Sequence, residues 1–188
     1  NTIEKSYPTI LDIGCGYGGL SFEISKLFPN SLVLAFEIRN SVTQYVEKKI
    51  QALRRFDQAE NVAVQWGNTM RNLMRYIQPH SIDKIFILFP DPQFKKRKLK
   101  WRIISPQLMD EYAFILKETG KLYLVTDVKT YFDYAVPIIE QHPLFTRVEN
   151  PESDPSLDVA MNATEESKKV TRNGGSKYAA VFTRIQSS

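Results

Sequence analysis

The sequence of 188 residues is poor in the residue types that many kinds of active site require. Its single cysteine, Cys15, excludes an internal disulfide and a zinc site of several cysteines, and it favours a reducing compartment. The two histidines, His80 and His142, lack metal-ligand spacing, so we predict no metal site. No apolar run approaches the roughly 20 residues that a membrane-spanning helix needs.

The chain has the length of one domain, 1–188, and can bury a core without disulfide bonds. We expect no signal peptide. It starts at Asn1 rather than at methionine, a few residues before an apolar run of strand length. We therefore expect an excerpt of a longer protein that lacks most of an N-terminal extension.

Positive charge is concentrated in one short segment. The net charge is +4, yet residues 95–102 alone contribute six cations. These are Lys95, Lys96, Arg97, Lys98, Lys100 and Arg102. Such a focus predicts contact with a polyanion, although a solvated face or a localisation signal would have the same composition.

Apolar runs of strand length alternate with helical patterns along the chain. Strands are predicted over 9–13, 32–36, 62–66, 82–89, 121–126, 145–148 and 177–183. Helices are predicted over 20–28, about 41–56 with Ser41 as its cap, 106–116 and 131–141. This alternation indicates an α/β fold with a mostly parallel central sheet and helices on both faces. A polar stretch of about 25 residues before the last strand is predicted to be a long loop, a length that suggests function.

Ligands of parallel sheets bind beyond the carboxyl ends of the strands, and glycines and acids gather there in this sequence. Gly14-x-Gly16-x-x-Gly19 with Glu37 further on fits the fingerprint of a nucleotide cofactor. Asp12 stands just before this loop and would repel a pyrophosphate. It favours S-adenosylmethionine, which carries an amine and a sulfonium, over a dinucleotide, which remains the alternative.

The turn Phe89-Pro90-Asp91-Pro92 is the sharpest local motif. Its two prolines fix the backbone on either side of one acid. Beside a methyl donor, such a carboxylate can accept hydrogen bonds from a purine edge and offset charge on a methylated ring nitrogen. Methylation of an amino group would fit a similar turn. The motif could also be a turn with a structural role only. The neighbouring cations would contact phosphates, and Trp101 could stack on a base or equally anchor the segment to the core.

The combined motifs resemble those of the tRNA (guanine-N7)-methyltransferases, in particular their eukaryotic catalytic subunit. The matching stretches are DIGCGYGG at 12–19, FEIR at 36–39, FPDPQFK at 89–95, KWRIISP at 100–106 and TEESKKVTRNGG at 164–175. The resemblance implies a class I S-adenosylmethionine-dependent methyltransferase fold (Rossmann-like). It also implies methyl transfer to N7 of a guanine in the tRNA variable loop, with S-adenosylhomocysteine as the product and no metal.

The resemblance also implies a role for each residue of the site. Asp91 would be the active-site acid. The cofactor would be bound by Gly14, Glu37, Arg39, Asn68, Thr69, Leu88, Thr164 and Glu166. RNA would be bound by Lys95, Lys96, Arg97, Lys98, Lys100, Arg102 and Arg172. Ser167 departs from the family pattern, since a glycine is expected there.

Two further expectations come from the resemblance. It implies a WD-repeat partner subunit and a nuclear location, with a cytoplasmic pool also open. No association with membranes is expected, because the sequence has no long apolar run. An RNA-binding module that uses its pocket only structurally is the alternative from a different class.

Overall fold

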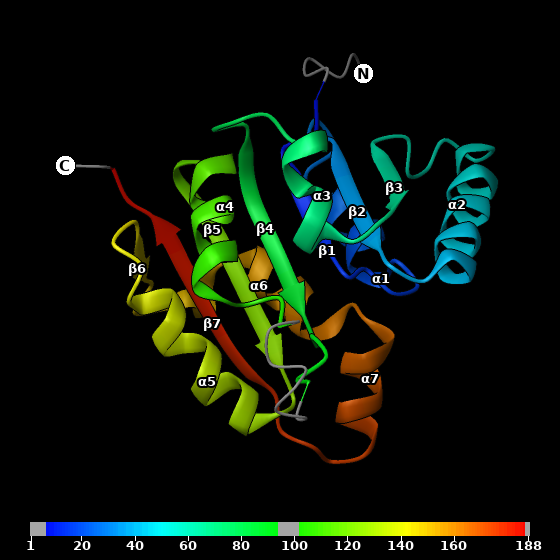
Figure 1. Ribbon diagram of the computed structural model, residues 1–188. Helices are drawn as coiled ribbons and strands as arrows, with labels where there is room; N and C mark the ends of the chain where they lie inside the picture. Colours follow the sequence, from blue (N-terminus) through cyan, green and yellow to red (C-terminus); the bar gives the residue numbers. More distant parts are fainter. Residues whose placement is uncertain (1–6, 94–101, 187–188) are drawn as a thin grey trace.

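The computed structural model describes residues 7–93 and 102–186, which form one sheet flanked by helices (Figure 1). Within these residues the strand order is β3-β2-β1-β4-β5-β7-β6. Strands β1 to β5 run parallel, and β7 is antiparallel to both β5 and β6. The strands are β1 (Ile10–Ile13), β2 (Val33–Glu37), β3 (Val62–Trp66), β4 (Ile82–Leu88), β5 (Leu116–Thr126), β6 (Phe145–Arg147) and β7 (Tyr178–Arg184).

Helices cover both faces of this sheet. They are α1 (Gly19–Leu27), α2 (Asn40–Arg54), α3 (Thr69–Tyr76), α4 (Pro106–Ile115), α5 (Lys129–Glu140), α6 (Pro155–Asn162) and α7 (Glu165–Arg172), with a 3-10 turn, η2 (Pro151–Ser153). One apolar core lies under α3, α4 and α5, and the other lies under α1, α2 and α6. No helix in the described ranges has the length and apolar character that crossing a membrane requires.

Strand β4 shows why both cores form. Ile85 and Ile87 belong to one core, and Phe86 and Leu88 belong to the other, because successive side chains of a strand point to opposite faces. A strand buried on both sides reads as a continuous apolar run. The predicted α/β architecture is confirmed, and each predicted strand is present in it.

One local prediction is wrong, and one helix was missed. Ser41 does not cap α2, because the helix already begins at Asn40, and Arg39 is the N-cap residue without a side-chain cap bond. The carboxylate of Glu37 accepts the backbone N–H of Arg39, which turns the chain directly from β2 into the helix. Helix α3 was not predicted, although Asn68 caps it by accepting the N–H of Met70 at 3.0 Å.

The long polar stretch is also not a loop. It contains η2, α6 and α7. Asp154 caps α6 by accepting the N–H of Ser156 at 2.9 Å, and Thr164 caps α7 by accepting the N–H of Ser167 at 3.0 Å. Asp154-Pro155 and Thr164-Glu165-Glu166 are both patterns of helix starts. Residues 151–172 are called the late unit below.

Candidate functional site

Two adjacent cavities lie at the carboxyl ends of the parallel strands. The larger, of about 310 Å³, is called the acidic cavity, and it lies between the glycine-rich loop, the turn after β4 and the start of α7. The smaller, of about 160 Å³, is called the apolar cavity. Its apolar lining residues are Ile13, Phe36, Ile38, Met70, Pro90 and Ile103. Gly14, Pro90 and Asp91 line both cavities, so one ligand could occupy the two together.

The glycine-rich loop needs its glycines for two different reasons. Gly16 has φ +54°, a left-handed conformation that favours glycine, and its N–H donates to Oε2 of Glu37 at 3.1 Å. Gly19 has an ordinary helical conformation, but a Cβ there would lie 2.7 Å from the carbonyl oxygen of Ala163. The third glycine of the fingerprint therefore allows the junction of α6 and α7 to lie against the start of α1.

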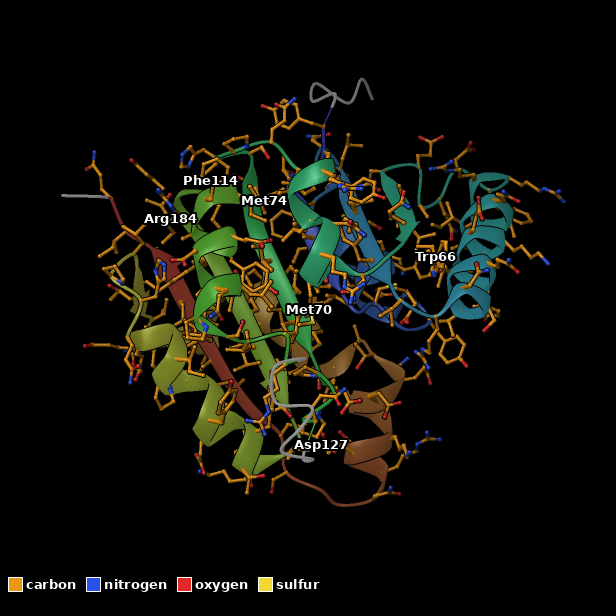
Figure 2. All side chains as sticks on the ribbon, in the orientation of Figure 1. Trp66, Met70, Met74, Phe114, Asp127 and Arg184 are labelled. Atoms are coloured by element: carbon orange, nitrogen blue, oxygen red, sulfur yellow. The ribbon has the colours of Figure 1, made fainter. Side chains whose placement is uncertain are left out.

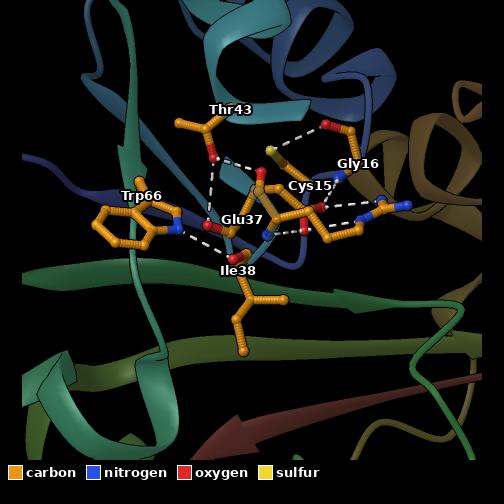
Figure 3. Close-up of polar contacts among 7 residues, drawn as sticks. Cys15, Gly16, Glu37, Ile38, Thr43 and Trp66 are labelled. Carbon is orange, nitrogen blue, oxygen red and sulfur yellow. Dashed lines mark hydrogen bonds and ion pairs between the residues drawn. The ribbon is translucent and has the colours of Figure 1, made fainter. Parts of the chain in front are cut away.

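Glu37 is buried with 4% of its surface exposed, and both carboxylate oxygens are occupied (Figure 3). Oε1 accepts the backbone N–H and Nε–H of Arg39 at 2.9 and 3.1 Å. Oε2 accepts the N–H of Gly16 and the Nη2–H of Arg39 at 3.1 and 3.2 Å. Burial opposes the charge, but the bonds from Arg39 and Gly16 outweigh it and hold the pKa of Glu37 below its ordinary value.

The backbone around Glu37 is fixed as well. Figure 3 shows the Nε1–H of Trp66 donating to the carbonyl oxygen of Ile38 at 3.0 Å. The hydroxyl of Thr43 donates to the carbonyl oxygen of Glu37 at 3.3 Å. The turn after β2 is thus held from β3 and α2, and it presents Arg39 rather than Glu37 to the acidic cavity.

Asp12 is a buried carboxylate on the wall of the acidic cavity. It accepts a hydrogen bond from the hydroxyl of Ser21 at 2.6 Å. Burial raises the pKa of Asp12 to about 6, although the bond from Ser21 opposes this shift. The group can therefore change its charge slightly below neutral pH.

The acceptor turn, residues 89–93, has a strained backbone. Phe89 and Gln93 both have φ +48°, which costs a non-glycine residue on the order of 1–3 kcal/mol. The N–H of Phe89 donates to the carbonyl oxygen of Val125 at 2.7 Å, and the N–H of Gln93 donates to Oδ1 of Asp91 at 2.9 Å. The exposed Asp91 is thus presented at the boundary of both cavities.

The late unit forms the opposite side of the acidic cavity. Thr164, Glu165 and Glu166 line it. At the start of the late unit, Oδ2 of Asp154 accepts bonds from Nζ of Lys121 and the hydroxyl of Tyr123, each at 2.8 Å. Burial opposes the charge of Asp154, but these bonds lower the pKa of Asp154 to about 2.

A second anchor holds the corner between α6 and α7. Nζ of Lys177 donates to the carbonyl oxygen of Met161 at 2.7 Å, to Oγ of Ser167 at 2.9 Å and to Oγ1 of Thr171 at 3.0 Å. Ser167 is fully buried, and its hydroxyl also donates to the carbonyl oxygen of Met161. The serine that replaces the expected glycine is therefore a bonded part of this corner.

The structure brings most of the predicted cofactor residues together. Those on the acidic cavity are Gly14, Arg39, Leu88, Thr164 and Glu166, and the predicted active-site acid Asp91 lines it too. Asn68 and Thr69 line the apolar cavity. Glu37 lies behind Arg39, while the exposed Arg172 lies at the end of α7 and outside both cavities.

Arg102 requires a correction. The sequence predicts that it contacts RNA, but the residue is only 9% exposed, and its Nε–H donates to the carbonyl oxygen of Pro92. A guanidinium turned inward in this way does not offer its charge to a phosphate. Lys95, Lys96, Arg97, Lys98, Lys100 and Trp101 lie outside the described residues.

Several lining residues were not assigned from the sequence. Tyr17, Asp127 and Glu165 line the acidic cavity, and Met70 and Ile103 line the apolar one. Asp127 lies at the rim, beyond the end of β5 (Figure 2), where the sequence predicts it because it directly follows a strand, although no role was assigned to it. Ile103 and Met70 carry no comparable signal.

Negative charge dominates the acidic cavity. Five carboxylates line it, and Arg39 supplies the single cation among its lining residues within the described ranges. The carboxylates belong to Asp12, Asp91, Asp127, Glu165 and Glu166. Such a wall attracts a cationic ligand and repels a phosphate. No three His, Cys, Asp or Glu side chains in residues 7–93 and 102–186 are grouped so that they could hold a metal ion.

Comparison with known proteins gives a consistent result. A family described as "Putative methyltransferase" matches residues 6–180. The tRNA (guanine-N(7)-)-methyltransferase of Caenorhabditis briggsae is 46% identical over 180 residues, covering 93% of this chain and 70% of that protein. The Bombyx mori protein of the same name is 48% identical, covering 93% and 76%. The human protein is 47% identical, covering 93% and 65%.

Solved structures resemble this one in fold. The 16S rRNA methyltransferase KamB superposes with a TM-score of 0.66 at 16% identity and covers 98% of this chain and 91% of its own. A SAM-dependent O-methyltransferase from Thermotoga maritima superposes with a TM-score of 0.61 at 14% identity, covering 98% and 62%. These likenesses confirm the predicted class I methyltransferase fold.

Proposed function

Because the chain belongs to the tRNA (guanine-N(7)-)-methyltransferase family, we propose that it transfers a methyl group from S-adenosylmethionine to N7 of a guanine in the variable loop of tRNA. The observation that supports this best is the acidic cavity, which meets a strained turn carrying Asp91. The product of the donor would be S-adenosylhomocysteine.

The two cavities fit the two ends of such a donor. The five carboxylates of the acidic cavity suit an amine and a sulfonium, and they would repel the pyrophosphate of a dinucleotide. The apolar side chains of Ile38 and Ile103 suit an adenine, with Asn68 and Thr69 at its edge. For Glu37 to bind the ribose, the guanidinium of Arg39, whose side chain is 59% exposed, would have to move away from it.

The proposed mechanism needs correct placement of the guanine against the methyl donor rather than a general base that removes a proton. When bound, S-adenosylmethionine supplies an electrophilic methyl group on a positively charged sulfur. The N7 atom of guanine already has a free lone pair, so no proton has to be removed there. Asp91 would accept hydrogen bonds from the purine edge and offset the positive charge that develops on the base. The prolines and the left-handed residues of the acceptor turn would hold its carboxylate in that place.

Among the proposed RNA contacts, Arg172 lies on the helix that borders this site. Arg172 is exposed at the end of α7, the helix that begins at the acidic cavity. With the basic segment 95–100 it would contact phosphates, which gives binding that weakens as salt increases.

The experiment is an assay of the purified chain with unmodified tRNA and radiolabelled S-adenosylmethionine, with nucleoside analysis of the product. We expect 7-methylguanosine. N6-methyladenosine or another amino-methylated product would contradict the proposal, and the absence of turnover with tRNA binding retained would favour a non-catalytic RNA-binding module. Binding of a nicotinamide cofactor in calorimetry would favour a dehydrogenase.

Replacing Asp91 tests its role within this reaction. We expect Asp91→Ala to lower kcat by more than about 100-fold, because orientation and charge compensation are both lost. Binding of S-adenosylhomocysteine should remain within a few fold. Asp133→Ala on α5, outside both cavities, is the matched control. Full activity of Asp91→Ala would show that this residue is not the active-site acid.

Two further proposals are supported by the resemblance. We propose a WD-repeat partner subunit and a nuclear location with a cytoplasmic pool. The neighbouring helices α3 and α4 expose Met74 and Phe114 by 41% and 44%, which offers an apolar surface to a partner (Figure 2). Co-purification from cells of the source organism and fractionation of those cells test both.

A further inference from the structure

We infer that Arg102 is a positioning residue that holds the acceptor turn from its inner side. Its Nε–H donates to the carbonyl oxygen of Pro92 at 2.8 Å. Pro92 directly follows Asp91 in the acceptor turn. The inference rests on the proposed function, because it assigns Arg102 to the placement of the carboxylate that orients the base. It replaces the prediction that this arginine contacts RNA.

The guanidinium itself lies against an aromatic surface. Its Cζ is 4.0 Å from the ring centroid of Tyr134 and 5.5 Å from that of Tyr131, both on α5. Arginine is suited to this place, because its planar group can stack on a ring while its Nε–H donates in the plane. Lysine could donate to the same carbonyl but could not stack flat on the ring.

The segment that carries Arg102 is fixed on its other side. The hydroxyl of Tyr112 donates to the carbonyl oxygen of Ile103 at 3.0 Å, and the hydroxyl of Tyr134 donates to that of Ile104 at 3.2 Å. Helices α4 and α5 therefore fix the backbone that follows Arg102, and the side chain of Arg102 connects this fixed backbone to Pro92. The acceptor turn needs such support, because Phe89 and Gln93 hold unfavourable backbone conformations that would otherwise relax.

The sequence offers a control that is matched in chemistry. Arg184 is also buried, and its Nε–H also donates to a backbone carbonyl at 2.8 Å, that of Ala113. It ends β7, which lies antiparallel to β5, so it stands at the opposite end of the sheet from Asp127 (Figure 2). Removing Arg184 should have the general cost of losing a buried arginine without disturbing the acceptor turn.

The test compares Arg102→Met, Arg102→Lys and Arg184→Met in the full chain, with its partner if activity requires one. We expect Arg102→Met to lower kcat about 30- to 100-fold, since a misplacement of about 1 Å can cost two orders of magnitude. The KM for S-adenosylmethionine and the calorimetric Kd for S-adenosylhomocysteine should stay within twofold. Arg102→Lys should recover part of kcat, and Arg184→Met should keep kcat within twofold of the wild type.

Three outcomes would overturn the inference. The first is an unchanged kcat in Arg102→Met, and the second is an equal loss in Arg184→Met. The third is weaker tRNA binding with a smaller salt dependence at unchanged kcat, which would restore the role in RNA contact. If Arg102→Met does not fold, Tyr134→Leu replaces it, and the same split between kcat and KM is expected. Wild-type chain that forms no 7-methylguanosine would instead contradict the proposed function.

Discussion

The two walls of the acidic cavity are held in place by different kinds of bond. The glycine-loop wall, residues 12–19 and 37–39, follows two adjacent parallel strands that pair from Ile10↔Val33 to Ile13↔Phe36. The N–H groups of Gly14 and Cys15 continue this pairing by donating to the carbonyl oxygen of Phe36, each at 2.9 Å. The opposite wall, the late unit, packs Leu157 and Ala160 of α6 into the core, and polar bonds of Asp154 and Lys177 fasten it to β5 and to the start of β7.

This difference indicates where the site is rigid and where it can open. Backbone pairing within a buried sheet is lost only when the sheet itself unfolds, whereas a few polar side-chain bonds can break locally. The walls meet at Gly19, where only a glycine leaves room for the backbone of Ala163. We therefore expect the glycine-loop wall to set the affinity for the donor and the late unit to close over it.

The largest effect is expected from breaking the glycine-loop wall at Glu37. Glu37→Ala leaves the half-buried N–H of Gly16 and the N–H of Arg39 without their acceptor. We expect a loss of about 2–3 kcal/mol in the free energy of unfolding and a more than 100-fold weaker binding of S-adenosylhomocysteine. Thermal unfolding and calorimetry measure the two, with the exposed Glu47→Ala on α2 as the control. Binding within threefold of the wild type would show that this wall does not set the affinity.

The same contrast explains what the sequence could predict. The glycine-loop wall follows two apolar strands in a local pattern, so its glycines and Glu37 were assigned correctly to one rim. The late unit depends on contacts between distant residues, such as Lys177 with Met161, which no local pattern contains. The first residues of its helices nevertheless follow patterns of helix N-termini, with Asp154-Pro155 at the start of α6 and Thr164 at the start of α7.

Arg102 shows a further limit. In the sequence it is one of six cations within eight positions, and composition does not show that its side chain turns inward. Its burial comes from Tyr134, which lies more than 30 residues further along the chain and on another helix. A run of charged residues predicts exposure to solvent, but the tertiary fold determines which of these residues are exposed.

A smaller effect is expected from breaking the late unit at Asp154. Asp154→Ala removes the cap of α6, worth about 1 kcal/mol, together with the bonds from Lys121 and Tyr123. We expect donor binding to weaken roughly 10- to 30-fold, the equivalent of about 1.4–2 kcal/mol, with only a small shift in Tm. Hydrogen exchange should quicken in 155–172 and stay unchanged in 10–37.

The control is Asp158→Ala, an exposed acid on the same helix. If exchange quickened equally in both walls, the late unit would not be a separately fastened element.

The stabilisation of the late unit by the Asp154 carboxylate should also be lost in acid. Because the pKa of Asp154 is about 2 when folded and its ordinary value is 3.8, its stabilisation is complete above pH 4 and disappears as the pH falls towards 2.

The smallest effect is expected from changing one charge of the glycine-loop wall by pH. Asp12 has a pKa of about 6, raised by burial, so it gains a proton as the pH falls from 7 to 5. Binding of the cationic donor should weaken about tenfold over this range, because each unit below the pKa costs a factor of ten. Asp154 keeps its charge throughout, since its pKa is about 2, and the late unit is therefore unchanged.

Stability should move in the opposite direction. Folded Asp12 takes up a proton at a higher pH than the unfolded chain, whose ordinary pKa is 3.8, so its contribution to stability increases as the pH falls from 6 towards 4. Asp12→Asn should bind the donor weakly and show no such dependence between pH 5 and 7. Calorimetry of donor binding and urea unfolding at each pH measure both quantities. Wild-type affinity that stays constant over this range would mean that Asp12 does not face the positive charge of the donor, and the preference of the acidic cavity for a cation would then rest on its other carboxylates, Asp91, Asp127, Glu165 and Glu166.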